Sequence, residues 1–173
     1  KKINVNHEIS YNFNSKIRSN LKKKFDIKKT LFISFGCRYI FKKETIQNFF
    51  SGNLINFHGA RLPYDAGAGH WSWKILRGER ISNQLVHLID KSIDKGPIID
   101  YKTTIFPSSC RIPTEFDHYA NNNLLVFYKN FISKIISGKK FQLKHQLDYL
   151  GTYYPRLNTE INGWIDWNMK SYE

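Results

Sequence analysis

Short apolar runs separated by turn residues divide the first part of the chain. Residues 30–36 form a continuous apolar run that ends in glycine, which is typical of a strand covered on both faces in a parallel sheet. Residues 43–50 carry apolar side chains at helical spacing, and residues 53–58 form a second apolar run. The order strand, helix, strand predicts a right-handed parallel crossover. Residues 37–41 should therefore lie beside His58 at one end of the sheet.

The middle of the chain has the pattern of a hairpin. Apolar and polar side chains alternate over residues 84–89 and again over residues 98–106, which predicts two strands. The segment between them is rich in turn residues and carries Asp94 and Gly96. We therefore expect an antiparallel pair whose turn presents the Asp94 carboxylate. His87, on the first of these strands, is interpreted as a structural residue.

Three further helices are expected. Residues 15–24 fit a short basic helix, and residues 70–76 fit a second helix after a glycine-rich loop. Aromatic and aliphatic residues then recur at helical spacing over a long stretch that Gly138 ends. Thr114 followed by Asp117 predicts the N-terminal cap of this long helix, whose apolar side should face the core.

Two polar side chains stand at the end of the second predicted strand. Asn56 and His58 are two residues apart, so they point to the same side of the pleat. With Asp94 they form a suitable set for acyl transfer. An amide can donate a hydrogen bond to a developing oxyanion, an imidazole can move a proton, and a carboxylate can orient the imidazole. Taken one at a time, the same residues fit a loop cap, an interior histidine and an ordinary turn aspartate.

Short segments around these residues give the set a family context. They are residues 56–58, 62–63, 67 and 93–99. Together they resemble the signature of the folate-dependent formyltransferases, whose catalytic set is Asn-x-His followed by Asp-x-Gly. The likeness extends from about residue 25 to the end of the chain and is greatest to the sugar N-formyltransferases. This greater likeness rests on residues 59–63, 69–73, 153–158 and 163–167.

The resemblance implies which residues form the site. Asn56, His58 and Asp94 would be catalytic, and no metal is required. An unprotonated amine would attack the formyl carbon while Asn56 and a protonated His58 stabilise the oxyanion. The residues implied for folate binding are Tyr39, Ile40, Phe41, Leu54 and Asp90.

Two positions depart from the family pattern. Ala60 stands where the family often has a serine, and Asp65 and Ala66 precede Gly67 where a basic residue is usual. The substrate contacts of this loop therefore stay open.

The implied fold is α/β, with a Rossmann-like, largely parallel sheet and flanking helices. From the resemblance we expect the chain to be short at both ends and to lack the family's first strand–helix unit, either because it is truncated or because pieces are missing from this sequence. Residues 1–140 would form the catalytic domain, and residues 141–173 a C-terminal extension.

The implied reaction is transfer of a formyl group from 10-formyltetrahydrofolate to the amino group of a nucleotide-linked amino sugar, such as a dTDP-amino-dideoxyhexose. A methionyl-tRNA formyltransferase, a formyltransferase with another acceptor, and a catalytically degenerate basic binding domain stay open as alternatives. The sequence does not specify the sugar, the nucleotide, the ring position or the oligomeric state, and a homodimer is one of the states it allows.

Composition narrows the remaining choices. The chain has 173 residues, 41% of them hydrophobic, which fits one folded domain. Its formal charge of +13 favours anionic partners, but no zinc-finger spacing or RNA-reading aromatic motif argues for nucleic acid. Cys37 and Cys110 are expected to be two buried free thiols. No apolar run reaches the roughly 18 residues that span a bilayer, so we expect a cytoplasmic protein without a membrane partner. The small nucleotide-sugar substrate is what the family resemblance implies.

Overall fold

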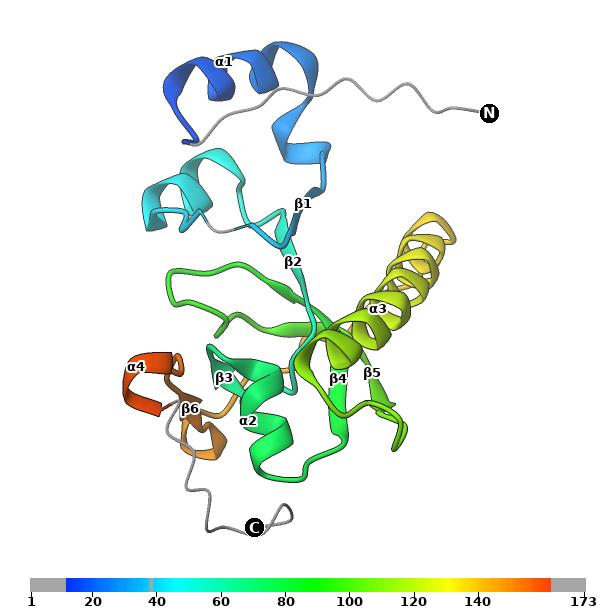
Figure 1. Ribbon diagram of the computed structural model, residues 1–173. Coiled ribbons are helices and arrows are strands. Elements are labelled where there is room, and N and C mark those ends of the chain that lie inside the picture. The colour runs from blue at the N-terminus through cyan, green and yellow to red at the C-terminus, as the bar shows by residue number, and fades with distance from the viewer. Residues whose placement is uncertain (1–11, 38, 163–173) are drawn as a thin grey trace, which may run out of the picture.

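A four-stranded mixed sheet lies at the centre of the structure, a computed structural model that describes residues 12–37 and 39–162 (Figure 1). The strand order is β1-β2-β4-β5, and only β1 and β2 are parallel. The α/β class with flanking helices is confirmed, but the sheet is mixed rather than largely parallel, because β4 runs antiparallel to both its neighbours. The strands are β1 (Phe32–Phe35), β2 (Leu54–His58), β4 (Ile81–Leu88) and β5 (Ile98–Ile105).

The helices and a second, small sheet surround this centre. The helices are α1 (Ser15–Lys24), η1 (Ile27–Lys29), η2 (Thr45–Phe49), α2 (His70–Leu76), α3 (Pro113–Ile136), η3 (Asp148–Leu150) and α4 (Thr159–Asn162). The small sheet is a parallel pair of β3 (Ala66–Gly67) and β6 (Tyr153–Tyr154). The three predicted helices are confirmed. The helical run between β1 and β2 is also confirmed, although η2 is a π-helix. The predicted resemblance at residues 163–167 lies outside the described residues.

Helix α3 covers one face of the sheet. Its buried residues Leu124, Phe127 and Phe131 pack on Ile55 and Phe57 of β2 and on β4, forming the main core. Because side chains alternate across a strand, the residues between them on β2 point to the opposite face. The sheet thus has one apolar face under α3, and its opposite face carries the polar side chains of Asn56 and His58 as well as the buried Leu54.

The start of α3 differs from the prediction. The helix begins at Pro113, and the carboxylate of Glu115 accepts hydrogen bonds from the backbone N–H groups of Arg111 and Ile112. The predicted cap by Thr114 and Asp117 is therefore wrong. A proline at the first helical position favours this start, because it lacks a donor that would go unused there.

Strand β1 is less covered than predicted. Ile33 is 38% exposed and Phe35 56% exposed, so the strand is not buried on both faces among the described residues. Phe32 does pack on Phe49 and Phe50. The difference arises because β1 forms an edge of the sheet, whereas the main core under α3 is centred on β2 and β4.

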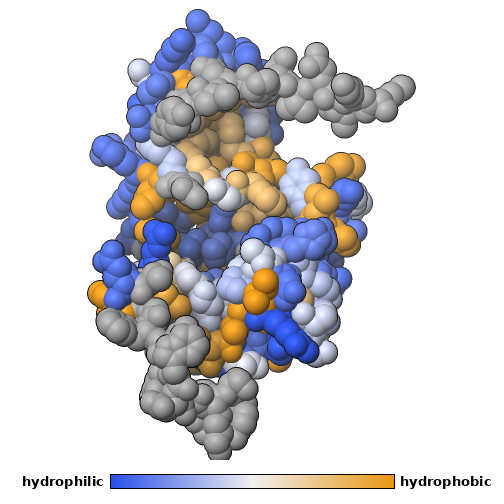
Figure 2. All heavy atoms as spheres, viewed as in Figure 1, coloured by the Kyte–Doolittle hydropathy of each residue, from blue (hydrophilic) through white to orange (hydrophobic). Residues whose placement is uncertain are grey.

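Helix α1 presents a basic surface. It ends in Lys22, Lys23 and Lys24, has no buried residue, and is covered by hydrophilic residues at the top of the view in Figure 2. Arg18, Lys22 and Lys23 line an open groove of about 620 Å³ between α1 and η2. We call this groove the α1 groove.

The chain after α3 returns to the sheet. Lys144 and Ile98 exchange two backbone hydrogen bonds of 2.8 Å, and Phe141 packs against the main core. Tyr153 and Tyr154 then pair with β3. The predicted domain boundary at residue 140 stays a prediction.

Candidate active site

The polar face of the sheet carries the predicted amide and imidazole. Asn56 and His58 lie on the same side of β2, and the register pairs Asn56 with His87 of the antiparallel strand β4. Directly opposed residues have Cβ atoms about 4.5–5.5 Å apart, so their side chains can interact. The rings of His58 and His87 lie 6.3 Å apart between centroids. The amide and two imidazoles therefore meet at one place.

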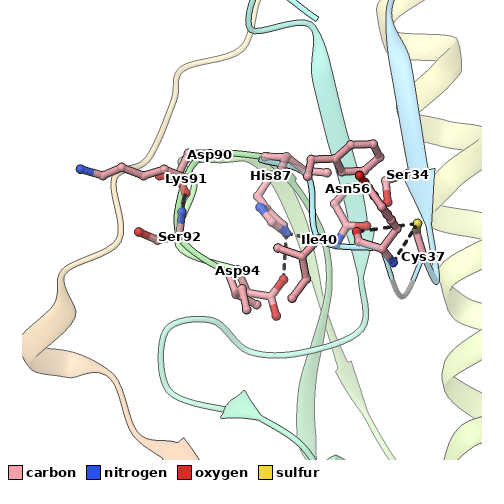
Figure 3. Close-up of a pocket in the computed structure, with 13 residues that line it drawn as sticks. Ser34, Cys37, Ile40, Asn56, His87, Asp90, Lys91, Ser92 and Asp94 are labelled. Carbon is pink, nitrogen blue, oxygen red and sulfur yellow. Dashed lines mark hydrogen bonds and ion pairs between the residues drawn. The ribbon is translucent and has the colours of Figure 1, made fainter. Parts of the chain in front are cut away.

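Polar side chains of Asn56, His87 and Asp94 lie close together (Figure 3). His87 Nδ1 lies 2.8 Å from the backbone oxygen of Leu88 and donates to it. In the neutral ring, Nε2 is then an acceptor, and the Asn56 side-chain amide donates to it at 3.2 Å. Asp94 Oδ1 lies 3.7 Å from the same Nε2, with which it can form an ion pair only when the ring is protonated. His87 thus fixes the orientation of Asn56 beside the carboxylate.

The loop between β4 and β5 carries Asp94. Asp94 has a left-handed backbone conformation with φ +56°, which is uncommon for a residue with a side chain. A Cβ on Gly96 would lie 1.8 Å from the backbone oxygen of Leu88, so a glycine is required there. The predicted hairpin is confirmed, and its loop brings Asp94 back to the polar face.

Both imidazoles are uncharged at neutral pH. Burial lowers the pKa of His58 below 6.5, and the nearby Asp94 charge opposes this without reversing it. Burial likewise lowers the pKa of His87, although the hydrogen bond to Leu88 and the Asp94 charge raise it. The expected protonated His58 therefore does not describe the free protein, because removing the ring from water disfavours its cation.

A cavity of about 120 Å³ opens beside these residues. It lies between the loop after β1 and the β4–β5 loop, and Asn56, His87 and Asp94 form part of its wall. Of the residues predicted to bind folate, four line it: Tyr39, Ile40, Phe41 and Asp90. Leu54 does not. Its side chain is 3% exposed and packs with Phe49 and Phe50, behind the site.

Cys37 also lines this cavity. It is exposed, whereas Cys110 is buried, and both are free thiols. The prediction of two buried thiols is therefore wrong for Cys37, because the chain turns outward at the end of β1.

Asp94 belongs to two cavities. A second cavity, of about 510 Å³, lies on its other side between the β4–β5 loop and the β3–β6 pair. Gly67, Lys95, Gln146 and Tyr153 are among its lining residues. The carboxylate is 27% exposed. It can therefore act on a group that enters from either side.

A buried ion-pair cluster supports the loop between His58 and the second cavity. Lys74, fully buried on α2, places Nζ 2.7 Å from Asp65 Oδ2 and donates to the backbone oxygen of Ile81 at 2.7 Å. Burial of Asp65 raises its pKa, but Lys74, Arg77 and Arg61 outweigh this and hold it below the usual value. This explains the departure at Asp65, which is a structural anion in this chain.

Sequence reasoning brought three of the site residues together and missed a fourth. The structure places Asn56 and Asp94 in the wall of the first cavity, with His58 beside them but not among the lining residues of either cavity; their catalytic roles stay a prediction. His87, interpreted from sequence as structural, lies between Asn56 and Asp94. The signal that could have revealed it is the antiparallel register with Asn56 across the predicted hairpin strand.

Two features are not found in the described part of the chain. Residues 12–37 and 39–162 contain no cluster of three metal-ligating side chains. No helix in these ranges is long and apolar enough to cross a membrane.

An α/β domain with an amide, an imidazole and a carboxylate in the wall of one cavity, and a second imidazole beside them, can perform group transfer at a carbonyl carbon. The family model described as formyl transferase matches residues 3–110, which is more than half of the chain. The chain therefore belongs to the formyl transferase family, and the resemblance found in the sequence is confirmed.

Relatives of known sequence and structure agree with this family. The methionyl-tRNA formyltransferase of Caldanaerobacter subterraneus subsp. tengcongensis is 31% identical over 113 residues, which cover 65% of this chain and 36% of the relative. The chain thus spans about a third of that protein's length.

Two solved structures share the fold. The N-formyltransferase of Helicobacter canadensis, in complex with folinic acid and dTDP-3-aminofucose, has a TM-score of 0.63 and 27% identity, covering 88% of this chain and 55% of its own. The formyltransferase PseJ of Anoxybacillus kamchatkensis, in complex with UDP-4,6-dideoxy-4-formamido-L-AltNAc and tetrahydrofolate, has a TM-score of 0.63 and 24% identity, covering 80% and 72%.

Proposed function

We propose that the protein transfers a formyl group from 10-formyltetrahydrofolate to the amino group of a nucleotide-linked amino sugar. The observation that carries this proposal is the position of Asp94, which borders both cavities and lies 3.7 Å from the His87 nitrogen that accepts a hydrogen bond from Asn56. Two substrates entering from opposite sides would meet at this carboxylate. The Helicobacter canadensis enzyme, which was solved with folinic acid and an amino sugar nucleotide, supports the choice of reactants.

The first cavity fits the formyl donor. The backbone amides of Ile40 and Phe41 make no hydrogen bond within the described part of the chain, so they are available to the edge of a heterocycle. The cavity has room for one end of the donor only. The rest would extend along a neighbouring groove lined by Lys43 and Lys91, whose ammonium groups suit glutamyl carboxylates.

The residues around Asp94 would then share the chemistry. When bound, the donor supplies an activated formyl carbon. The Asn56 amide and a neutral His58 N–H would donate hydrogen bonds to the formyl oxygen as it gains negative charge. Asp94 would accept the proton that the attacking amine loses. The new bond joins the amine nitrogen to the formyl carbon, the bond from that carbon to folate N10 breaks, and the proton ends on N10.

The second cavity would hold the acceptor. Its walls combine backbone groups at Gly67 with Tyr153, Gln146 and Lys95, so polar and aromatic groups surround the opening beside Asp94. An aromatic ring can stack on a base or sugar, and a lysine suits a diphosphate. A cytoplasmic location and a homodimer stay predictions from the sequence.

A direct assay tests this function. The protein is mixed with 10-formyltetrahydrofolate and either dTDP-4-amino-4,6-dideoxyglucose or its 3-amino isomer, and mass spectrometry follows the gain of one formyl group. His58→Asn should abolish transfer while leaving the circular dichroism spectrum unchanged. His118→Asn is the matched control, because His118 is exposed on α3. Full activity of His58→Asn would refute the mechanism, and no transfer to either sugar would count against the acceptor class.

Methionyl-tRNA is a second candidate acceptor. The methionyl-tRNA formyltransferase relative and the basic α1 groove favour it. Neutralised phosphates make binding strongly salt-dependent. Under this alternative, initiator tRNA would bind with a steep salt dependence that a Lys22→Glu and Lys23→Glu double variant reduces. Folate binding without transfer to any acceptor would instead indicate a degenerate binding domain.

A further inference from the structure

Gln146 holds the loop of Asp94 from the side of the second cavity. Its side-chain Nε2 donates to the backbone oxygens of Asp94 and Gly96, both at 2.8 Å. The two N–H groups of a single amide can thus serve both carbonyls. The two carbonyl groups belong to the residues on either side of Lys95, in the part of the loop where Asp94 has its left-handed conformation.

The opposite side of this loop is already in contact with the sheet. The close approach of Gly96 to the backbone oxygen of Leu88 leaves no room for movement toward β4. Gln146 therefore closes the side that faces the second cavity. The loop is thus held between the end of β4 and the amide of Gln146, with the Asp94 carboxylate 3.7 Å from His87.

The position of Gln146 is itself fixed. Two residues earlier, Lys144 exchanges backbone hydrogen bonds with Ile98 at the start of β5. The ammonium group of Lys144 also lies over the ring of Tyr101, 4.7 Å from its centroid. The segment that carries Gln146 is thus joined to the strand that follows the loop, and the amide is held at a set distance from Asp94.

We propose that Gln146 is a positioning residue for the transfer reaction, which holds the Asp94 carboxylate in place between the two cavities. The inference rests on the proposed function, because it gives Gln146 a part in the reaction that Asp94 serves. Misplacing a reacting group by about 1 Å can cost about 100-fold in rate. The amide of Gln146 acts on the backbone and does not touch the reacting atoms.

The test uses two variants of similar shape that lack the donors. Gln146→Met has no polar group, and Gln146→Glu has an acceptor in place of the amide. Gln142→Met is the matched control, since Gln142 is exposed on the same segment. Steady-state kinetics with both substrates give kcat and each KM. A separate NMR titration follows the ring protons of His87, whose pKa is lowered by burial and raised by Asp94 among other charges.

Positioning and purely structural roles give different results. If Gln146 positions Asp94, kcat falls about 10- to 100-fold in both variants while KM for the formyl donor stays within about twofold. In Gln146→Met, which adds no charge, the pKa of His87 falls as well, because the carboxylate moves away from the ring. An unchanged titration of His87 in Gln146→Met overturns the proposal. If the wild-type protein transfers no formyl group, the proposed function fails, and the His87 titration still decides whether Gln146 holds Asp94.

Discussion

Replacing Lys74 by methionine tests the buried ion-pair cluster beside the second cavity. Methionine has a similar length and no charge, so the variant keeps the packing of α2 while Asp65 loses its closest cation. The backbone oxygen of Ile81 also loses its donor. Both side chains of the pair are almost fully buried, Lys74 at 0% and Asp65 at 2% exposure.

Removing one partner of a buried pair costs about 3–5 kcal/mol, because an uncompensated charge stays in a medium of low polarity. Arg77 lies 3.2 Å and Arg61 3.7 Å from Asp65, and both side chains are about 30% exposed. Solvent therefore weakens their attraction to the Asp65 carboxylate, so they replace the charge of Lys74 only in part. We therefore expect the free energy of unfolding to fall by about 3 kcal/mol at pH 7, near the lower end of this range, as measured by urea unfolding. Lys16→Met, an exposed control on α1, should stay within about 0.5 kcal/mol.

The dependence on pH checks the cause. In the wild type the pKa of Asp65 lies below 3.8, so its stabilisation is complete above that pH and is lost as the pH falls through the folded-state pKa. In Lys74→Met, the pKa of Asp65 rises, because fewer positive charges oppose the effect of burial. As the pH falls, Asp65 is therefore protonated first in the variant, which removes its uncompensated charge. The difference in the free energy of unfolding between wild type and variant should be smaller at pH 4 than at pH 7. A loss below about 1 kcal/mol at pH 7, or an equal loss at both pH values, would refute the reasoning.

Two further changes have expected outcomes. Gln84 is fully buried, and neither of its side-chain polar atoms has a hydrogen-bond partner among the described residues. Gln84→Met should therefore raise the free energy of unfolding by about 1–3 kcal/mol; a loss of stability would contradict this. Burial, with the charge of Lys74, lowers the pKa of His70 to about 3. The stabilisation from the neutral His70 ring is therefore complete above pH 6.5. As the pH falls toward 3, the free energy of unfolding decreases by up to about 1.4 kcal/mol per pH unit. In urea titrations across this range, His70→Gln should show a shallower slope, and an equal slope would exclude His70 as the cause.

The sequence pattern was sufficient for features that depend on residues close together in the chain. The period of two placed Asn56 and His58 on one face, and the turn residues around Gly96 indicated a hairpin that presents Asp94. The helical spacing of aromatic residues located the core side of α3, although the cap at Glu115 depended on backbone donors that the sequence pattern does not show.

The remaining features depend on contacts between distant residues. Lys74 and Asp65 do not stand out in the sequence, and only the packing of α2 against its preceding loop makes them a buried pair. Gln146 lies in a segment without a clear period, and its partners are far back in the chain. Leu54 lies close to Asn56 in the sequence, and the family resemblance implies that it binds folate. Its side chain instead packs with Phe49 and Phe50, away from the first cavity.

The mixed order of the sheet is what allows the site to form. The parallel pair β1 and β2 places the loop of Tyr39 next to the cavity, as in sheets where ligands bind at strand ends. An all-parallel sheet would offer strand ends and loops only. Here the antiparallel strand β4 sets His87 directly opposite Asn56, and its register with β5 shifts next to His87, an irregularity that can re-aim a side chain. The same strand then leads into the loop of Asp94, so a single hairpin supplies both the imidazole that accepts from the amide of β2 and the carboxylate beside that imidazole.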